Sequence, residues 1–175
     1  MDKFVLSIGL IAVLLTGCKK DDTPPLSGTV TIDNKRMEGS GTYYIMGFTF
    51  APAQKVSTLS QPGPDISLVV DRSSGIITLQ TGNFNDSFFK SGEYADAVTS
   101  KQAFDALTSF GPVQWTGLAE PLKINQVWIF RTRSDHYAKI RIISITTKDI
   151  NGEIEAACTF EWAYQPDGTL TFPGR

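Results

Sequence analysis

Three stretches in the C-terminal third decide the fold: QVWIFRT at residues 126–132, YAKIRIISI at residues 137–145 and IEAACTFEWAY at residues 154–164. All three are rich in β-branched and aromatic residues, which favour strands. The segments between them contain Ser134-Asp135 and Asn151-Gly152, and Asn-Gly is a strong signal for a tight hairpin turn. The pattern therefore predicts three consecutive antiparallel strands.

The position of the first turn sets the expected register. A two-residue turn at Ser134-Asp135 places Phe130 opposite Lys139 and Trp128 opposite Arg141, and opposed residues point to the same face of a sheet. Such an aromatic and cationic face is either a ligand-binding surface or a second layer of core beneath a helix, with the two cations reaching its edge. A shift of the register by one residue would exchange the two faces.

The rest of the domain adds further strands and one helix. Strands are expected at residues 29–33, 42–50, 65–71 and 76–80, and the last two form a hairpin around Ser73-Ser74-Gly75. A helix is expected from Thr99 or Ser100, either of which could cap it. Apolar residues follow at helical spacing as far as Phe110, and Gly111-Pro112 ends the helix. We therefore expect a mainly β fold of antiparallel sheets and hairpins, with one packed helix near residues 99–110.

The N-terminus indicates export. Residues 4–15 form an uncharged run shorter than the roughly 20 residues that span a bilayer, but long enough for a secretory signal. Leu15-Thr16-Gly17-Cys18 resembles the lipobox of bacterial lipoproteins, in which the cysteine receives lipid carrying acyl chains such as palmitate. We expect a cleaved signal peptide at residues 1–17, a lipidated flexible tether at 18–28 and a single β-rich domain at 29–175. The alternative is an ordinary secreted protein with a fortuitous cysteine.

Charge and residue types limit the possible chemistry. The net charge of −2 does not favour nucleic-acid binding. Once Cys18 carries lipid, Cys158 has no partner, so it is expected to be a buried apolar filler. His136 is the single histidine and is expected to be a solvated residue at a hairpin tip. The carboxylates are scattered, and nucleotide-binding motifs are absent. The sequence therefore predicts a protein that is not an enzyme.

Two blocks, FRTRSDHYAKIRI at residues 130–142 and FEWAYQPDG at residues 160–168, resemble the HmuY-like haem-binding lipoprotein family. The lipobox matches as well, and Phe48-Thr49-Phe50 followed by Gln54-Lys55-Val56 is similar to an early strand and turn of that family. The resemblance covers most of the mature chain loosely, and it is specific in the C-terminal block. It implies a β fold displayed on the outer membrane, with haem held between two axial side chains.

The chain departs from this family at the haem ligands, because one histidine cannot supply a histidine pair. Methionine is the other axial type that the resemblance implies, so Met37 and Met46 are the candidate cofactor-binding residues. The competing interpretation is that Met46 fills core and Met37 lies on the surface. No metal-ligand spacing surrounds Cys158.

The expected function is that of a lipid-anchored protein of the cell outer membrane, exposed at the cell surface, with a non-catalytic ligand-binding domain that captures haem. Its partners would then be the membrane, through Cys18, and haem or a haemoprotein. The alternative function is a surface module that binds a protein or a glycan, without haem.

Overall fold

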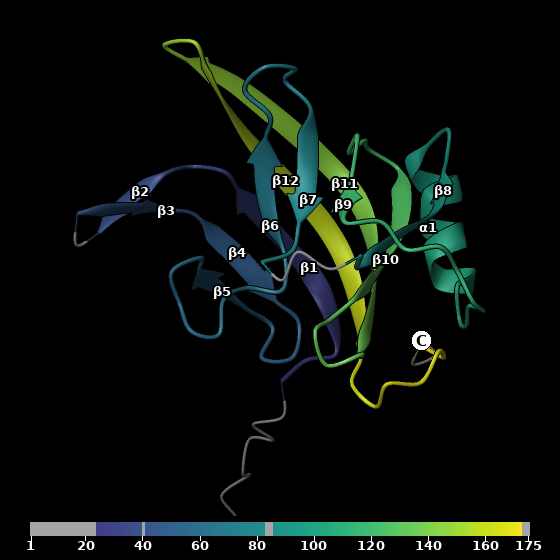
Figure 1. Ribbon diagram of the computed structural model, residues 1–175. Helices are drawn as coiled ribbons and strands as arrows, with labels where there is room; N and C mark the ends of the chain where they lie inside the picture. Colours follow the sequence, from purple (N-terminus) through teal and green to yellow (C-terminus); the bar gives the residue numbers. More distant parts are fainter. Residues whose placement is uncertain (1–23, 40, 83–85, 173–175) are drawn as a thin grey trace, which may run out of the picture.

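The computed structural model describes residues 24–39, 41–82 and 86–172 (Figure 1). Along the chain, the described elements are β1 (Ser27–Asp33), β2 (Met37–Gly39), β3 (Thr42–Tyr44), β4 (Met46–Thr49), β5 (Gln54–Ser57), β6 (Ser67–Val70), β7 (Ile77–Gln80), β8 (Phe88–Glu93), α1 (Ala97–Ala106), β9 (Leu118–Ala119), β10 (Gln126–Arg131), β11 (Tyr137–Ile150) and β12 (Glu153–Gln165). The predicted fold class is confirmed: the chain is mainly β, its sheets are antiparallel, and one short helix is present.

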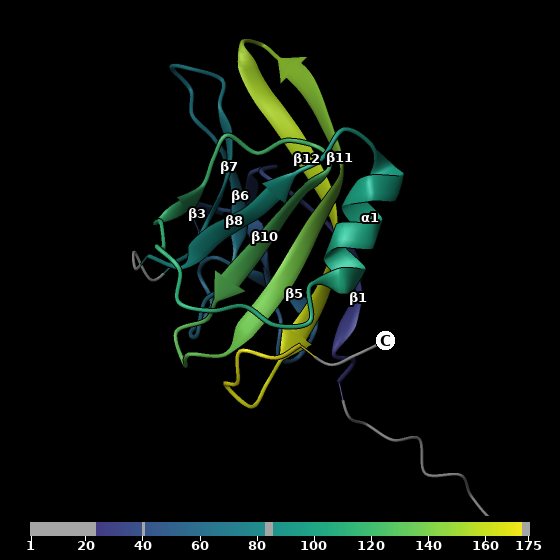
Figure 2. The ribbon, with the colours of Figure 1, turned by 90° about the vertical axis from the view of Figure 1, so that its right-hand side faces the viewer.

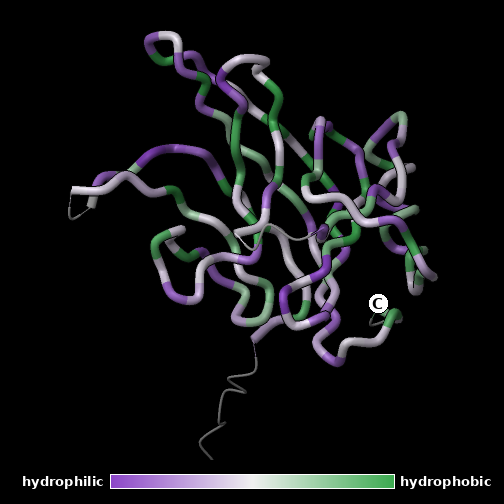
Figure 3. The backbone as a smooth tube through the Cα atoms, in the orientation of Figure 1, coloured by the Kyte–Doolittle hydropathy of each residue, from purple (hydrophilic) through white to green (hydrophobic). Residues whose placement is uncertain are grey.

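The main sheet has the strand order β1-β12-β11-β10-β8. Three smaller sheets accompany it, β2-β3, β4-β5 and β6-β7-β9, and a bridge between Phe48 and Ile66 links β4 to the start of β6. In Figure 2 the helix lies against the outer face of the main sheet, beside β11. The β2–β3 hairpin projects from the body (Figure 1), and Figure 3 colours this arm mostly hydrophilic or neutral.

The core lies between the main sheet and the layer formed by β4, β6 and β7. Phe48 and Phe50 reach across to the main sheet, with ring centroids 5.3 Å apart for Phe48 and Trp162 and 5.5 Å apart for Phe50 and Phe130. Burial of apolar surface of this size is the principal driving force for folding. Both layers are therefore held by a continuous aromatic cluster.

The predicted register of β10 and β11 is wrong by one residue. Ile129 pairs with Lys139 and Val127 with Arg141, whereas Trp128 and Phe130 lie opposite Ile140 and Ala138. The physical reason is the loop, which has three residues instead of two: Thr132 N–H donates to the His136 carbonyl at 2.8 Å, and Asp135 has a left-handed φ of 55°. The faces are therefore exchanged, so the aromatics face the core and the two cations face the helix.

The helix begins and ends earlier than predicted. Asp96, not Thr99 or Ser100, is the N-cap, and its carboxylate accepts a hydrogen bond from Thr99 N–H at 2.8 Å. The helix ends at Ala106, before Phe110, because Leu107 leaves the helical conformation at a ψ of 82°, and the ammonium of Lys139 caps the carbonyl oxygens of Phe104 and Leu107. The prediction of one helix packed on the sheet is confirmed, and its bounds are corrected to Ala97–Ala106.

Other sequence predictions are confirmed. The β11–β12 turn lies at Asn151-Gly152, both with positive φ (56° and 85°), and β6 and β7 form the predicted hairpin. Cys158 is a buried free thiol. β1 starts at Ser27, two residues before the predicted start of the domain at Thr29.

The predicted signal peptide at residues 1–17 and the predicted lipid attachment at Cys18 lie outside the described residues. Within the described part of the chain, no helix is long and apolar enough to cross a membrane.

Candidate functional site

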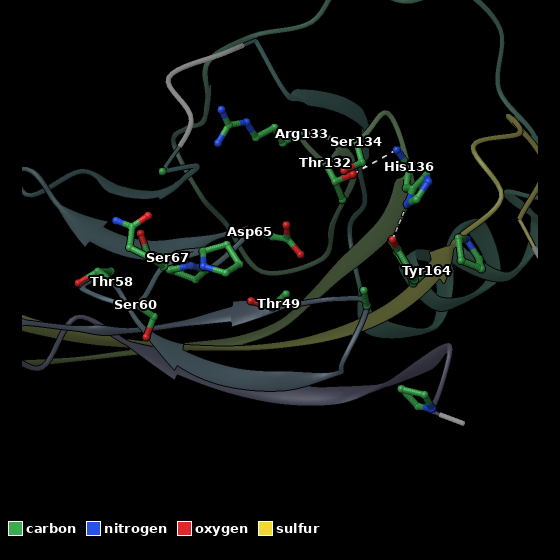
Figure 4. Close-up of a pocket in the computed structure, with 18 of the residues that line it drawn as sticks. Thr49, Thr58, Ser60, Asp65, Ser67, Thr132, Arg133, Ser134, His136 and Tyr164 are labelled. Carbon is green, nitrogen blue, oxygen red and sulfur yellow. Dashed lines mark hydrogen bonds between the residues drawn. The ribbon is translucent and has the colours of Figure 1, made fainter. Parts of the chain in front are cut away.

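A cleft of about 1080 Å³ lies beside the lower end of the main sheet, where four segments meet. They are the end of β4, the loop from β5 into β6, the β10–β11 loop and the end of β12, and the end of β7 and the first described residues also contribute, with Gln80, Pro24 and Leu26. Figure 4 shows side chains from these segments around one space. The lining is rich in hydroxyl and amide groups, from Thr49, Thr58, Ser60, Gln61, Ser67, Gln80, Thr132 and Ser134. The titratable or charged residues of this lining are Asp65, Arg133, His136 and Tyr164.

His136 is not the solvated tip residue that the sequence predicts. It is half-buried, and its Nδ1 lies 2.9 Å from the hydroxyl oxygen of Tyr164 at the end of β12. Its backbone N–H donates to the Thr132 hydroxyl at 3.1 Å. The three-residue loop that shifts the register therefore also turns the imidazole inward, against Tyr164 (Figure 4).

Asp65 stands in the middle of the cleft in Figure 4. One of its carboxylate oxygens accepts the backbone N–H of Phe50 at 2.8 Å. Burial raises the pKa of this carboxyl above its ordinary value, although the Phe50 hydrogen bond and the charge on His136 act in the opposite direction. Burial, and then the charge of Asp65, also raises the pKa of Tyr164. Asp65, His136 and Tyr164 thus form one electrostatically coupled group.

The cleft wall also contains an unsatisfied polar atom. Thr49 Oγ1 is buried and has no hydrogen-bond partner, and it is the single such side-chain nitrogen or oxygen among the residues that the structure describes. Buried hydroxyls nearly always have a partner, because an unpaired one costs free energy. Thr49 Oγ1 is therefore an unsatisfied oxygen inside the wall of the cleft.

The two methionines lie elsewhere. Met37 begins β2 and pairs with Tyr44, while Met46 begins β4 and pairs with Ser57. Both side chains are partly exposed, and neither lines the cleft. Residues two apart in a strand share a face, so Met46 lies on the same face of β4 as the core residue Phe48. Thr49, which lines the cleft, is three residues from Met46 and lies on the opposite face.

The predicted cationic face is occupied by the protein itself. Arg141 makes two contacts with one carboxylate oxygen of Glu161, at 3.0 Å from Nε and 2.9 Å from Nη2, and both side chains are nearly buried. Lys139 Nζ lies 4.7 Å from the ring centroid of Phe104 and donates to main-chain carbonyls. Of the two interpretations, the structure favours a layer of core beneath the helix.

No protein-family model matches the chain, and no curated protein is significantly similar to it. Over the described ranges, no group of three or more histidine, cysteine or acidic residues is arranged to hold a metal ion. The cleft is therefore the strongest candidate site. It emerges from the geometry, because the sequence patterns did not single out Asp65 or Tyr164 as site residues.

Proposed function

We propose that this protein is an exported lipoprotein, anchored through Cys18 and exposed on the outer membrane, whose β-rich domain binds a ligand without transforming it. The observation that carries the proposal is the preformed cleft of about 1080 Å³, with convergent polar groups from the loops and strand ends that surround it. Ligand sites of small molecules and side chains are typically concave, with a few precisely placed polar groups.

Binding accounts for the His136 geometry better than catalysis does. Covalent catalysis requires a nucleophile hydrogen-bonded to a base that can remove its proton. The ring partner of His136 is the Tyr164 hydroxyl, and burial raises the pKa of that phenol, so it holds its proton. The pair therefore serves to shape and polarise the cleft wall.

The anchor places the cleft near the membrane. Pro24, at the rim of the cleft, follows Cys18 by six residues, which reach at most about 22 Å when fully extended. Incorporation of radiolabelled palmitate into the chain tests the anchor, with Cys18→Ser as the variant and Cys158→Ser as the matched control. We expect label in the wild type and the control and none in Cys18→Ser, and equal labelling of all three would contradict the anchor.

Haem is the first candidate ligand. The resemblance of the C-terminal block to HmuY-like lipoproteins supports it, and so does the register of the projecting arm. Met37 lies in the arm, where it pairs with Tyr44, and Met46 follows Tyr44 by two residues at the start of β4, so the two thioethers lie close along the chain at the base of the arm. A thioether is an established axial ligand of haem iron.

Haem titration of the purified full chain in detergent, followed by absorbance in the oxidised and reduced states, tests this candidate. We expect a saturable haem spectrum that Met37→Ala or Met46→Ala removes and His136→Ala keeps. If His136→Ala is the one variant that loses the spectrum, the haem site lies in the cleft and not at the methionines. No spectral change in the wild type would reject haem capture.

The second candidate is a surface module that binds a protein or a glycan. The lining of the cleft favours it, because hydroxyl, amide and carboxylate groups recognise polar partners and neither methionine is among them. The two candidates use different parts of the domain, so variants in the arm and in the cleft separate them.

A further inference from the structure

We propose that the cleft receives a positively charged nitrogen group, a primary ammonium or a guanidinium, with Asp65 as its counter-ion. This inference rests on the proposed function, and it names the class of ligand that the cleft takes. The same chemistry is offered by a free amine and by a lysine or arginine side chain of a partner protein.

The position of the Asp65 carboxylate carries the argument. It is partly buried at the centre of the cleft, and its one described hydrogen bond is to the Phe50 N–H. No lysine or arginine of the described chain lies within 4.0 Å of it, unlike the nearly buried Glu161, which Arg141 contacts at 2.9 Å. A carboxylate removed from water without a paired charge is costly. The charge on His136 acts on Asp65, but the described chain provides no direct ion pair with a lysine or arginine, and a ligand cation in the cleft would supply one.

Neutral oxygen atoms around Asp65 suit the remaining donors of such a group. An ammonium has three N–H donors and a guanidinium has five, so one carboxylate does not satisfy either. The hydroxyl groups of Thr58 and Ser60 and the amide of Gln61 line the same cleft, and none of these three residues is buried. The lining therefore offers acceptors beside the negative charge.

The other charged and titratable groups of the cleft are Arg133, His136 and Tyr164. Arg133 is exposed on the β10–β11 loop, and in Figure 4 it stands apart from Asp65. An anionic ligand would contact Arg133 at the solvent edge of the cleft. In the interior it would be repelled by Asp65, and charges interact more strongly there. A cation is therefore the better fit for the inner part of the cleft.

The single histidine provides a direct readout, because the imidazole resonances of His136 report on the cleft without assignment of other signals. The purified full chain in detergent would be titrated with cadaverine, as a free amine, and with Nα-acetyl-lysine amide, as a side chain. The Nε-acetylated form of the second probe is neutral, although it is larger by one acetyl group, and it serves as the uncharged control. We expect saturable shifts with one or both cationic probes and none with the neutral one; the stronger of the two identifies the source.

Three variants test the role of Asp65. Asp65→Asn keeps an acceptor for the Phe50 N–H but removes the charge, so affinity should fall by about tenfold or more. Asp86→Asn, at an exposed position outside the cleft lining, is the matched control and should bind like the wild type. Arg133→Ala removes a cation from the rim and should tighten binding, a change that loss of structure would not produce.

Equal affinity of wild type and Asp65→Asn would overturn the inference, as would the absence of a saturable shift with both cationic probes. If haem or maltohexaose binds while the amines do not, the ligand class is wrong and the proposed ligand-binding function stands. If none of these probes binds, the proposed function fails with it.

Discussion

The ammonium nitrogen of Lys139, near the start of β11, lies 2.7 Å from the carbonyl oxygen of Phe104 in the helix. The same nitrogen donates to the Leu107 carbonyl at 2.9 Å. The last carbonyls of a helix lack intrahelical partners and carry partial negative charge, so a cation there is favourable. Lys139 therefore caps the C-terminal end of the helix and fastens the helix to the main sheet.

Lys139→Met keeps most of the side-chain volume but leaves both carbonyls without this donor. Unsatisfied buried acceptors cost about 1–3 kcal/mol each, so we expect the free energy of unfolding to fall by at least ~1 kcal/mol. Urea denaturation measures it. Lys148→Met, at an exposed position of the same strand, is the control and should change stability by less than ~0.5 kcal/mol. Equal stability of the two variants would contradict the role of Lys139.

Gly47 lets β4 approach the chain that enters β6. A methyl group at this position would lie well inside contact distance of the Ile66 carbonyl oxygen and the Pro64 ring. Gly47→Ala should therefore destabilise the protein by about 1–3 kcal/mol and weaken ligand binding, since Pro64 lines the cleft. Gly111→Ala, where a methyl group meets nothing within 4 Å, is the matched control. The melting temperatures of the two variants test this prediction, and Gly47→Ala should melt at the lower temperature. Similar melting temperatures would contradict the close approach at Gly47.

The sequence predicts the strands well where local chemistry determines them. Asn151-Gly152 requires two positive φ angles and therefore marks its turn unambiguously. The β10–β11 loop is different, because Asp135 adopts a left-handed φ that asparagine or glycine would have signalled more clearly. One additional loop residue exchanged the faces of the sheet, so the surroundings of Lys139 and Arg141 could not be predicted.

The candidate site depends on tertiary contacts that no local pattern contains. His136 and Tyr164 meet because β11 and β12 pair with Ala138 opposite Tyr164. Asp65 reaches the same place through the β4–β6 bridge at Phe48 and Ile66. A correct β11–β12 register alone would have placed Tyr164 near the loop that carries His136, and this was the one signal available in the sequence.

Cys158 should be chemically inert in the folded protein. Burial raises its pKa to about 12, so thiolate, the reactive form, is scarce at pH 8. In the Cys18→Ser variant Cys158 is the single thiol. We expect no alkylation by iodoacetamide under native conditions and complete alkylation in guanidinium chloride, followed by mass spectrometry. Rapid alkylation of the native chain would show that the β1–β12–β11 region opens.

Asp65 should make stability depend on pH in the direction opposite to most carboxylates. Because its folded pKa lies above the unfolded value of 3.8, the folded state holds this proton more tightly. Its contribution is therefore fully present below pH 3.8 and is lost as pH rises through the folded pKa. Asp71, whose pKa is lowered to about 2 by hydrogen bonds with Ser73 and Ser74, acts in the opposite sense.

The contribution of Asp65 is isolated by comparing wild type with Asp65→Asn, since the other carboxylates are common to both chains. The unfolding free energy of the wild type relative to the variant should decrease with rising pH above 3.8. Urea denaturation across a pH series measures this difference. An increase with pH would mean that a cation of the chain already pairs with Asp65.

The most direct test of the account is the titration of the Asp65 side-chain carboxyl by carbon-13 NMR, without and with Nα-acetyl-lysine amide. We predict a pKa above 3.8 in the free protein, because partial burial of the carboxylate outweighs its hydrogen bond to Phe50 and the charge on His136, and a fall in that pKa when the ammonium binds. A pKa at or below 3.8 in the free protein, or one that the probe does not change, would contradict a cleft built to receive a cation.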